Sequence, residues 1–119
     1  MTTEIKQQSF AQFFGGKEPN EFIFEDEKCV VFEEQYDKQA PVHFLVVPKT
    51  KISRLMDATE DDELLLGHLL IVARRIAAER GIAKSGFRVV MNEGVNSCQT
   101  IEQFYVQVLG GRQMWWPFS

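Results

Sequence analysis

Few imidazole and thiol groups, the side chains most often used as nucleophiles and transition-metal ligands, are present in this chain. It contains two histidines, His43 and His68, and two cysteines, Cys29 and Cys98. Neither cysteine belongs to a Cys-x-x-Cys pair, so we expect two reduced thiols, no metal and no cofactor. His68 has no acidic or basic partner close in sequence, which favours a core or surface role over catalysis.

A row of polar residues near the C-terminus is the second place where chemistry could occur. Strand alternation over 103–109 puts Gln103, Tyr105 and Gln107 on one face and apolar residues on the other. The polar face meets either solvent or a ligand, and solvent is common because one side of an antiparallel sheet is often wet. A tyrosine with a pKa near 10 is only about 0.1% ionised at pH 7.

The composition limits the classes of protein that need to be considered. A chain of 119 residues that is 45% hydrophobic fits one domain over 1–119, with 1–8 as a flexible N-terminal segment. The net charge of −4 disfavours nucleic acid as a partner. Polar residues interrupt the longest apolar stretch, so no membrane span is expected. No signal peptide is apparent, and we expect a cytoplasmic or nuclear protein, with an organelle as the alternative.

The elements that must position these residues follow from periodicity and end signals. Apolar residues at helical spacing predict a long helix that is capped by Thr59 and ends at Gly81, and Ser9 to Gly16 has the pattern of a short helix. Five strands are predicted, at 22–25, 28–33, 42–47, 87–91 and 103–109. The long helix also has apolar residues outside its main stripe, at Leu66, Leu70 and Ala77, which favours burial against a second subunit.

Five short stretches, taken in order and spacing, resemble one protein family. They are IFED at 23–26, QAPVHFLVVPK at 39–49, LLGHL at 65–69, VMNEG at 90–94 and VLGGRQM at 108–114. Together they resemble the Hint branch of the histidine triad family, from about Phe10 to Pro117. The resemblance implies an α+β fold: a five-stranded antiparallel sheet with one long and one short helix, and two such sheets joined across a dimer.

The resemblance also implies an ancestral activity, the hydrolysis of purine nucleoside phosphoramidates. In the family, the central histidine of a His-x-His-x-His strand attacks phosphorus. The matching positions here are Gln103, Tyr105 and Gln107. Because glutamine is no nucleophile and cannot exchange a proton as imidazole does, we expect no intact catalytic residue.

Other positions match the family's nucleotide site and its interface. The ribose-binding acid falls at Glu34, or at Glu33 in the other register of a loop that is one residue longer than usual. The remaining nucleotide-binding candidates are His43, Asn92, Gln99, Thr100, Phe10 and Phe13, the last two being equally explained as core. Cys98 replaces a family glycine, where a side chain would crowd a phosphate.

The last residues of the chain suggest a protein interface. Trp115 and Trp116 are expected to contact a partner, with a clamp over the protein's own core as the alternative. The preferred function is therefore a catalytically silent family member, a homodimer or a subunit of a larger complex, with weak purine nucleotide binding retained. The alternatives are a nucleotide-binding module, or a phosphoramidate hydrolase with altered chemistry at Tyr105 or His43.

Overall fold

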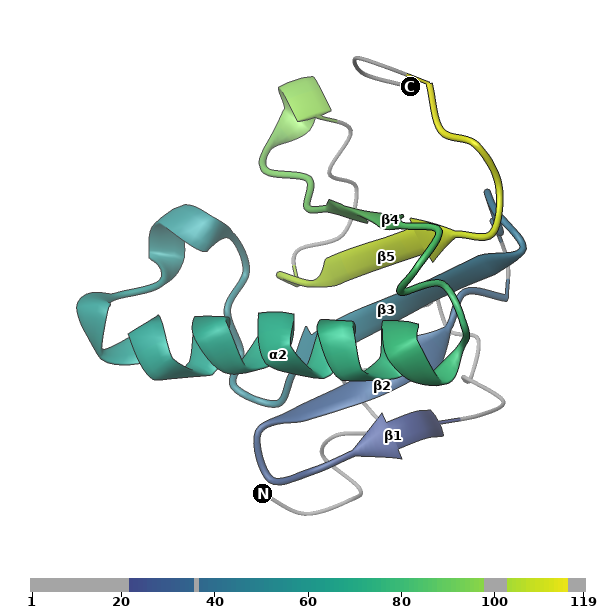
Figure 1. Cartoon of the computed structure of the whole chain (residues 1–119). Coiled ribbons are helices and arrows are strands. Elements are labelled where there is room, and N and C mark those ends of the chain that lie inside the picture. The colour runs from purple at the N-terminus through teal and green to yellow at the C-terminus, as the bar shows by residue number, and fades with distance from the viewer. Residues whose placement is uncertain (1–21, 36, 98–102, 116–119) are drawn as a thin grey trace.

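The computed structural model describes residues 22–35, 37–97 and 103–115. Within them, one sheet has a long helix, α2, lying across one of its faces (Figure 1). The strands are β1 (Phe22–Glu25), β2 (Cys29–Glu33), β3 (Val42–Pro48), β4 (Phe87–Val90) and β5 (Val106–Gly110), and α2 spans Glu63–Glu79. Every pair is antiparallel and the strand order is β1-β2-β3-β5-β4. The expected short helix falls outside the described residues.

Asp26 closes the β1–β2 hairpin with its side chain. One carboxylate oxygen, Oδ1, accepts the backbone N–H groups of Lys28 and Cys29, both at 2.8 Å. Aspartate is common in such turns because its short side chain reaches the backbone a few residues further on. The register between β1 and β2 shifts between Phe22 and Phe24, so the outer strand of the hairpin is irregular.

The long helix begins and ends where the sequence predicts. Thr59 and Asp62 form a capping box, in which Asp62 Oδ2 accepts the N–H of Thr59 at 2.9 Å. The first turn is a 3-10 helix, η2 (Glu60–Asp62), and α2 continues directly from it. Gly81 follows the helix with a φ of +79°, a conformation that favours glycine.

The main core lies between α2 and the sheet. The helix contributes Leu69, Val72, Ala73, Ile76 and Ala77, and the sheet contributes Cys29, Val31, Phe44, Val46, Val106 and Val108. Ala77 and Leu66 pack into this same core, whereas Leu70 is 52% exposed. The expectation that all three widen the stripe beyond what one sheet covers was therefore wrong for Ala77 and Leu66.

A second, smaller core covers the opposite face of the sheet. Val30 and Phe32 of β2 and Leu45 and Val47 of β3 are buried there, and Tyr105 packs against them. The sheet is thus buried on both faces at its centre.

The fifth strand begins later than predicted. The sequence indicated 103–109, and the structure has Val106–Gly110. The reason is a hydrogen bond of 2.6 Å from Phe104 N to Ile52 O, which joins this part of the chain to the loop after β3 instead of to the sheet. The predicted alternation survives, because Phe104, Val106 and Val108 all lie in the core beneath α2.

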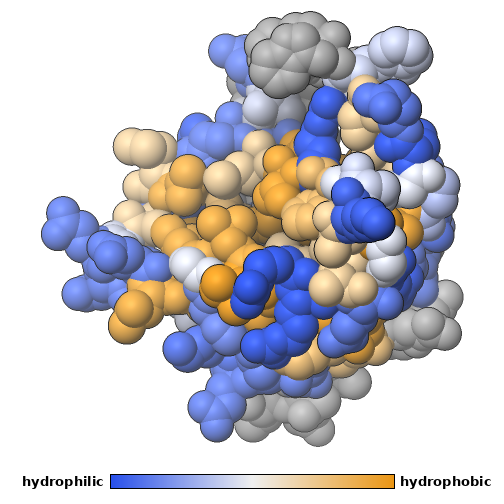
Figure 2. All heavy atoms as spheres, in the orientation of Figure 1, coloured by the Kyte–Doolittle hydropathy of each residue, from blue (hydrophilic) through white to orange (hydrophobic). Residues whose placement is uncertain are grey.

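β4 is an edge strand with exposed apolar side chains. Phe87, Val89 and Met91 are each exposed at or just beyond this edge. Figure 2, which looks onto α2, shows apolar residues gathered at the centre of this face, over the helix and toward β4. Among the described residues, no helix is long and apolar enough to cross a membrane.

The buried stripe of α2 yields a stability prediction. Leu69→Ala should lower the free energy of unfolding by about 2–5 kcal/mol, because it removes a fully buried side chain and leaves a cavity. Leu64→Ala is the matched control: Leu64 lies on the same helix but is 81% exposed, so its change should stay within about 0.5 kcal/mol. Urea unfolding followed by circular dichroism measures both, and equal losses would contradict the described core.

Candidate functional site

The face of the sheet opposite α2 carries the row of polar residues singled out in the sequence. Leu45 of β3 pairs with Phe32 on one side and with Gln107 on the other, and Gln107 also pairs with Val90 of β4. Paired residues of an antiparallel sheet point to the same face, so these four form one row across the sheet. Because side chains alternate along a strand, His43 shares this face with Leu45.

His43 is held at both ring nitrogens. It is 2% exposed, and its Nδ1 accepts the backbone N–H of Gln39 at 3.0 Å. Its Nε2 lies 2.8 Å from Gln107 Oε1. Because the amide N–H of Gln39 can only donate, Nδ1 carries no proton and Nε2–H donates to the glutamine oxygen. The ring is therefore a neutral imidazole with both nitrogens engaged.

Tyr105 is the middle one of the three polar residues Gln103, Tyr105 and Gln107. Its side chain is half-buried against the smaller core. Burial, and after it the negative charge of Glu34, raises the pKa of the Tyr105 phenol above its ordinary value of 10.0. Both effects disfavour phenolate, so the residue is a neutral phenol at physiological pH.

The structure distinguishes the two candidate acids. Glu33 forms ion pairs with Arg80 after α2, at 2.8 Å, and with Lys38, at 3.4 Å. Glu34 instead acts electrostatically on Tyr105, and its Oε1 accepts the N–H of Asp37 at 3.1 Å. Of the two registers considered for the acid, the one with Glu34 places a carboxylate at the candidate site.

Gln103 differs from the other two residues of the row. It is buried and precedes β5, and its Nε2 donates to Phe104 O at 3.0 Å. A solvated polar face was one expectation for this row, and Gln103 does not fit it. The row is thus composed of one buried amide, one half-buried phenol and one amide bonded to His43.

The other predicted residues are less closely grouped. Asn92 is half-buried in the loop after β4. Trp115 is 69% exposed, and its backbone oxygen accepts a hydrogen bond from Arg88 of β4 at 2.8 Å. The candidates outside the described residues are Phe10, Phe13, Gln99, Thr100 and Trp116, together with Cys98.

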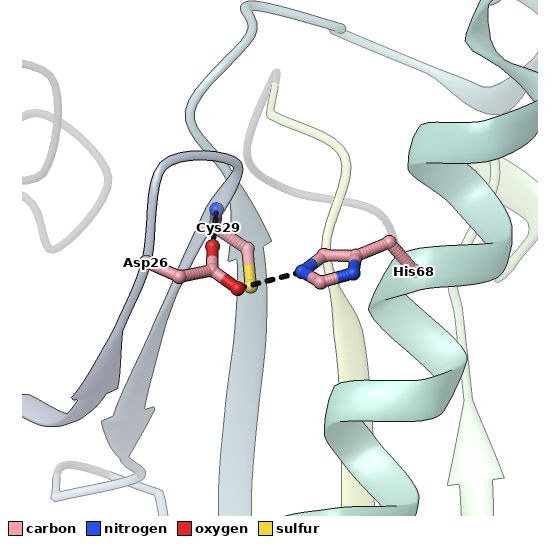
Figure 3. Close-up of side chains that lie close together, drawn as sticks. All are labelled: Asp26, Cys29 and His68. Carbon is pink, nitrogen blue, oxygen red and sulfur yellow. Dashed lines mark hydrogen bonds and ion pairs between the residues drawn. The ribbon is translucent and has the colours of Figure 1, made fainter.

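A second group of reactive side chains lies on the α2 side of the sheet and was not expected. His68 Nε2 is 2.6 Å from Asp26 Oδ2, although the two residues are 42 positions apart. Cys29 of β2 lies beside them (Figure 3). The prediction of a core or surface role for His68 considered its sequence neighbours alone, and the fold supplies an acidic partner distant in sequence. The only available signal was the Asp26–Cys29 spacing in a tight turn.

This arrangement on the polar face supports binding better than covalent chemistry. The described residues there offer amides, a phenol, a neutral imidazole and the carboxylate of Glu34, all of which form hydrogen bonds. A covalent mechanism needs an activated nucleophile next to a base, and the imidazole here is turned to Gln39 and Gln107.

Comparison with known proteins adds a family and a fold. Residues 7–114 match the family model described as "Scavenger mRNA decapping enzyme C-term binding". An uncharacterised HIT-like protein of Synechococcus elongatus is 41% identical over 99 residues, which are 83% of this chain and 85% of the relative. A 14 kDa zinc-binding protein of Zea mays is 42% identical over 101 residues, 83% of this chain and 77% of the relative.

A solved structure of a HIT family protein has the same fold as this chain. The crystal structure of a HIT family hydrolase from Legionella pneumophila superimposes with a TM-score of 0.82 at 35% identity. The match covers 91% of this chain and 96% of that chain. The five-stranded antiparallel sheet with one main helix is therefore the fold of these proteins.

The Tyr105 environment yields a pH prediction. Tyr36→Phe leaves Tyr105 as the only tyrosine, and its phenolate absorbance should appear at a pH above 10.0 in the folded protein. Because the folded pKa is above the unfolded one, the stability that this group contributes is complete below about pH 10 and is lost as the pH rises through the folded pKa.

Two glutamate variants test the cause of the shift. Glu34→Gln should lower the Tyr105 pKa toward its ordinary value, because it removes the neighbouring negative charge. Glu33→Gln is the matched control, since Glu33 is paired with Arg80. A titration midpoint that moves only with Glu33 would contradict the described environment.

Proposed function

Because this chain belongs to the histidine triad family, we propose that it is a catalytically silent member, an interaction, regulatory or assembly subunit that retains weak purine nucleotide binding. Gln103, Tyr105 and Gln107 take the places of the family's three histidines in this proposal. The chain has two histidines in total, so a triad of imidazoles is excluded by count.

The placement of the two histidines carries the proposal. His43 is buried with both ring nitrogens bonded, and His68 belongs to α2, on the other side of the sheet. The two histidines therefore lie on opposite faces of the sheet. Removing the nucleophile of a covalent mechanism costs on the order of 10⁴–10⁶ in rate, and losing its partners as well adds little.

The neutral state of Tyr105 supports the same reading. A phenol attacks phosphorus only after losing its proton, and both burial and Glu34 oppose that loss. His43 would have to release the N–H of Gln39 from its Nδ1 before that nitrogen could accept a proton.

A nucleotide-binding module, or a hydrolase with altered chemistry, is the alternative. It is favoured by the survival of amide and hydroxyl groups at Asn92, Gln99 and Thr100, which are able to donate hydrogen bonds to a phosphate. The Legionella relative is described as a hydrolase, which favours it as well. Titration calorimetry with adenosine monophosphate separates the two: heat of binding in the micromolar range favours the module, and its absence favours the silent subunit.

The assembly part of the proposal rests on the β4 edge. Phe87 and Val89 leave apolar surface exposed on an edge strand, and Met91 extends it. Arg88 holds the backbone of Trp115 next to this strand, which adds an exposed indole to the same region. Exposed aromatic and apolar groups of this kind are enriched in protein interfaces.

We predict no turnover of a fluorogenic adenosine phosphoramidate above the uncatalysed rate. The reason is that no imidazole occupies the position of attack. Steady-state fluorescence measures it, and turnover that Tyr105→Phe abolishes would contradict the proposal and identify a phenol nucleophile.

A repair variant serves as the positive control for that assay. Replacing Gln103, Tyr105 and Gln107 together by histidine should restore measurable hydrolysis if the rest of the pocket is competent. If the triple variant is folded by circular dichroism and still inactive, the pocket has been closed elsewhere, with Cys98 as the first residue to replace by glycine.

We also predict a homodimer that depends on the β4 edge and the C-terminal tail. Val89→Glu, or deletion of residues 114–119, should weaken dimerisation at least about tenfold, because a charge or a gap replaces buried apolar surface. Thr50→Glu is the matched control, an exposed site after β3. Sedimentation velocity measures the change, and a wild-type monomer at micromolar concentration would leave a different protein as the partner.

A further inference from the structure

Three side chains with metal-binding atoms converge where the β1–β2 hairpin meets α2. An oxygen of Asp26, the sulfur of Cys29 and a ring nitrogen of His68 all lie within 4.8 Å of one another. Figure 3 shows the three side chains pointing toward a common centre, two from the hairpin and one from the helix. This group is the only one of its kind among the residues that the structure describes.

Each of the three groups is positioned by the fold. Asp26 Oδ1 is already occupied by the N–H groups of Lys28 and Cys29, which turns Oδ2 toward His68. Cys29 begins β2 and pairs with Pro48 of β3, so its sulfur is carried by a strand inside the sheet. His68 lies on α2 next to the buried Leu69. Hydrogen bonds to the non-coordinating oxygen of a carboxylate are typical of metal ligands, because they orient the oxygen that binds.

We propose that Asp26, Cys29 and His68 form a binding site for one zinc ion, with water as the fourth ligand. The donor set decides between metals. Magnesium and calcium prefer oxygen ligands alone, whereas thiolate, imidazole and carboxylate together are typical of zinc. The proposal concerns the α2 side of the sheet, so it goes beyond the function proposed for the opposite face and does not depend on it.

The geometry requires only a small movement. Zinc lies about 2.3 Å from sulfur and about 2.0 Å from nitrogen or oxygen, which places tetrahedral nitrogen and oxygen ligands about 3.3 Å apart. His68 Nε2 and Asp26 Oδ2 are 2.6 Å apart and would separate by about 0.7 Å as the ion replaces the proton between them. Both side chains are partly exposed, at 24% and 27%, so they have freedom to move and leave a path for the ion and the water.

The charges balance when the ion is bound. Zinc binds the thiolate of Cys29, the carboxylate of Asp26 and the neutral ring of His68. The thiol proton is released to solvent, the proton between His68 Nε2 and Asp26 Oδ2 is displaced by the ion, and the bound ring carries its single proton on Nδ1. One dication then faces two negative ligands. Cys29 is 0% exposed, and a neutral complex avoids an uncompensated charge at this buried position.

Cobalt(II) and zinc(II) alone, added to chelator-treated full-length protein, test the site. Cobalt should bind at one ion per chain and give the near-ultraviolet absorption of a thiolate-to-cobalt transition, together with the visible bands of tetrahedral coordination. Zinc should abolish both by displacement and should raise the thermal midpoint, because it binds the folded state.

Single substitutions assign the ligands. Cys29→Ser should remove the thiolate absorption, and His68→Gln and Asp26→Asn should each weaken zinc binding more than about tenfold in a competition with a chromophoric chelator. An asparagine at position 26 still accepts the two turn hydrogen bonds through its oxygen, which preserves the hairpin. Cys98→Ser is the matched control for the second thiol and should keep wild-type affinity and absorption.

Several results would overturn the proposal. These are no thiolate absorption in the wild-type protein, absorption that disappears with Cys98→Ser instead of Cys29→Ser, or zinc affinity unchanged by His68→Gln. Cys29→Ser could be unfolded by circular dichroism in the absence of metal. The zinc affinities of His68→Gln and Asp26→Asn then test the proposal, because these two side chains are partly exposed and their substitution leaves the buried strand intact.

Discussion

The pairing of β3 with β5 is the interaction on which the rest of the structure depends. It joins the hairpin half of the sheet to the half that contains β4, and its register places Leu45 opposite Gln107 and Val46 opposite Val106. A shift of one residue would exchange the two faces of β5. The apolar residues would then leave the core beneath α2, and the amide of Gln107 would no longer reach His43.

This register separates two kinds of chemistry on the two faces of one sheet. The face opposite α2 has hydrogen-bonding groups, with Glu34 close enough to affect Tyr105, above buried apolar side chains of β2 and β3, which suits recognition of a polar ligand. The face beneath α2 is largely apolar, with Asp26, Cys29 and His68 meeting at the start of β2 and the Glu33–Arg80 ion pair at its end. The two faces of the sheet therefore offer different functional groups, with hydrogen-bonding groups on the first and three side chains with metal-binding atoms on the second.

Much of this arrangement could be predicted from sequence, because it depends on neighbours along the chain. The cap at Thr59, the glycine end at Gly81 and the alternation of Phe104, Val106 and Val108 are local signals. The start of β5 is not local, since it depends on the hydrogen bond from Phe104 to Ile52. The Asp26–His68 contact spans 42 positions, so no local pattern contains it. The prediction of a nucleotide site came from the family resemblance and from no local pattern either.

The two edges of the sheet are built differently, and the difference bears on aggregation. β1 has an irregular register, and Glu25 at its end is paired with Lys49, features that discourage a further strand from adding to that edge. β4 is more regular, with Phe87 and Val89 exposed. An open apolar edge is a template for uncontrolled strand addition by any extended chain. A symmetric contact between the β4 edges of two copies would cover this exposed edge. Self-association there would then prevent other chains from adding to it and keep the protein soluble.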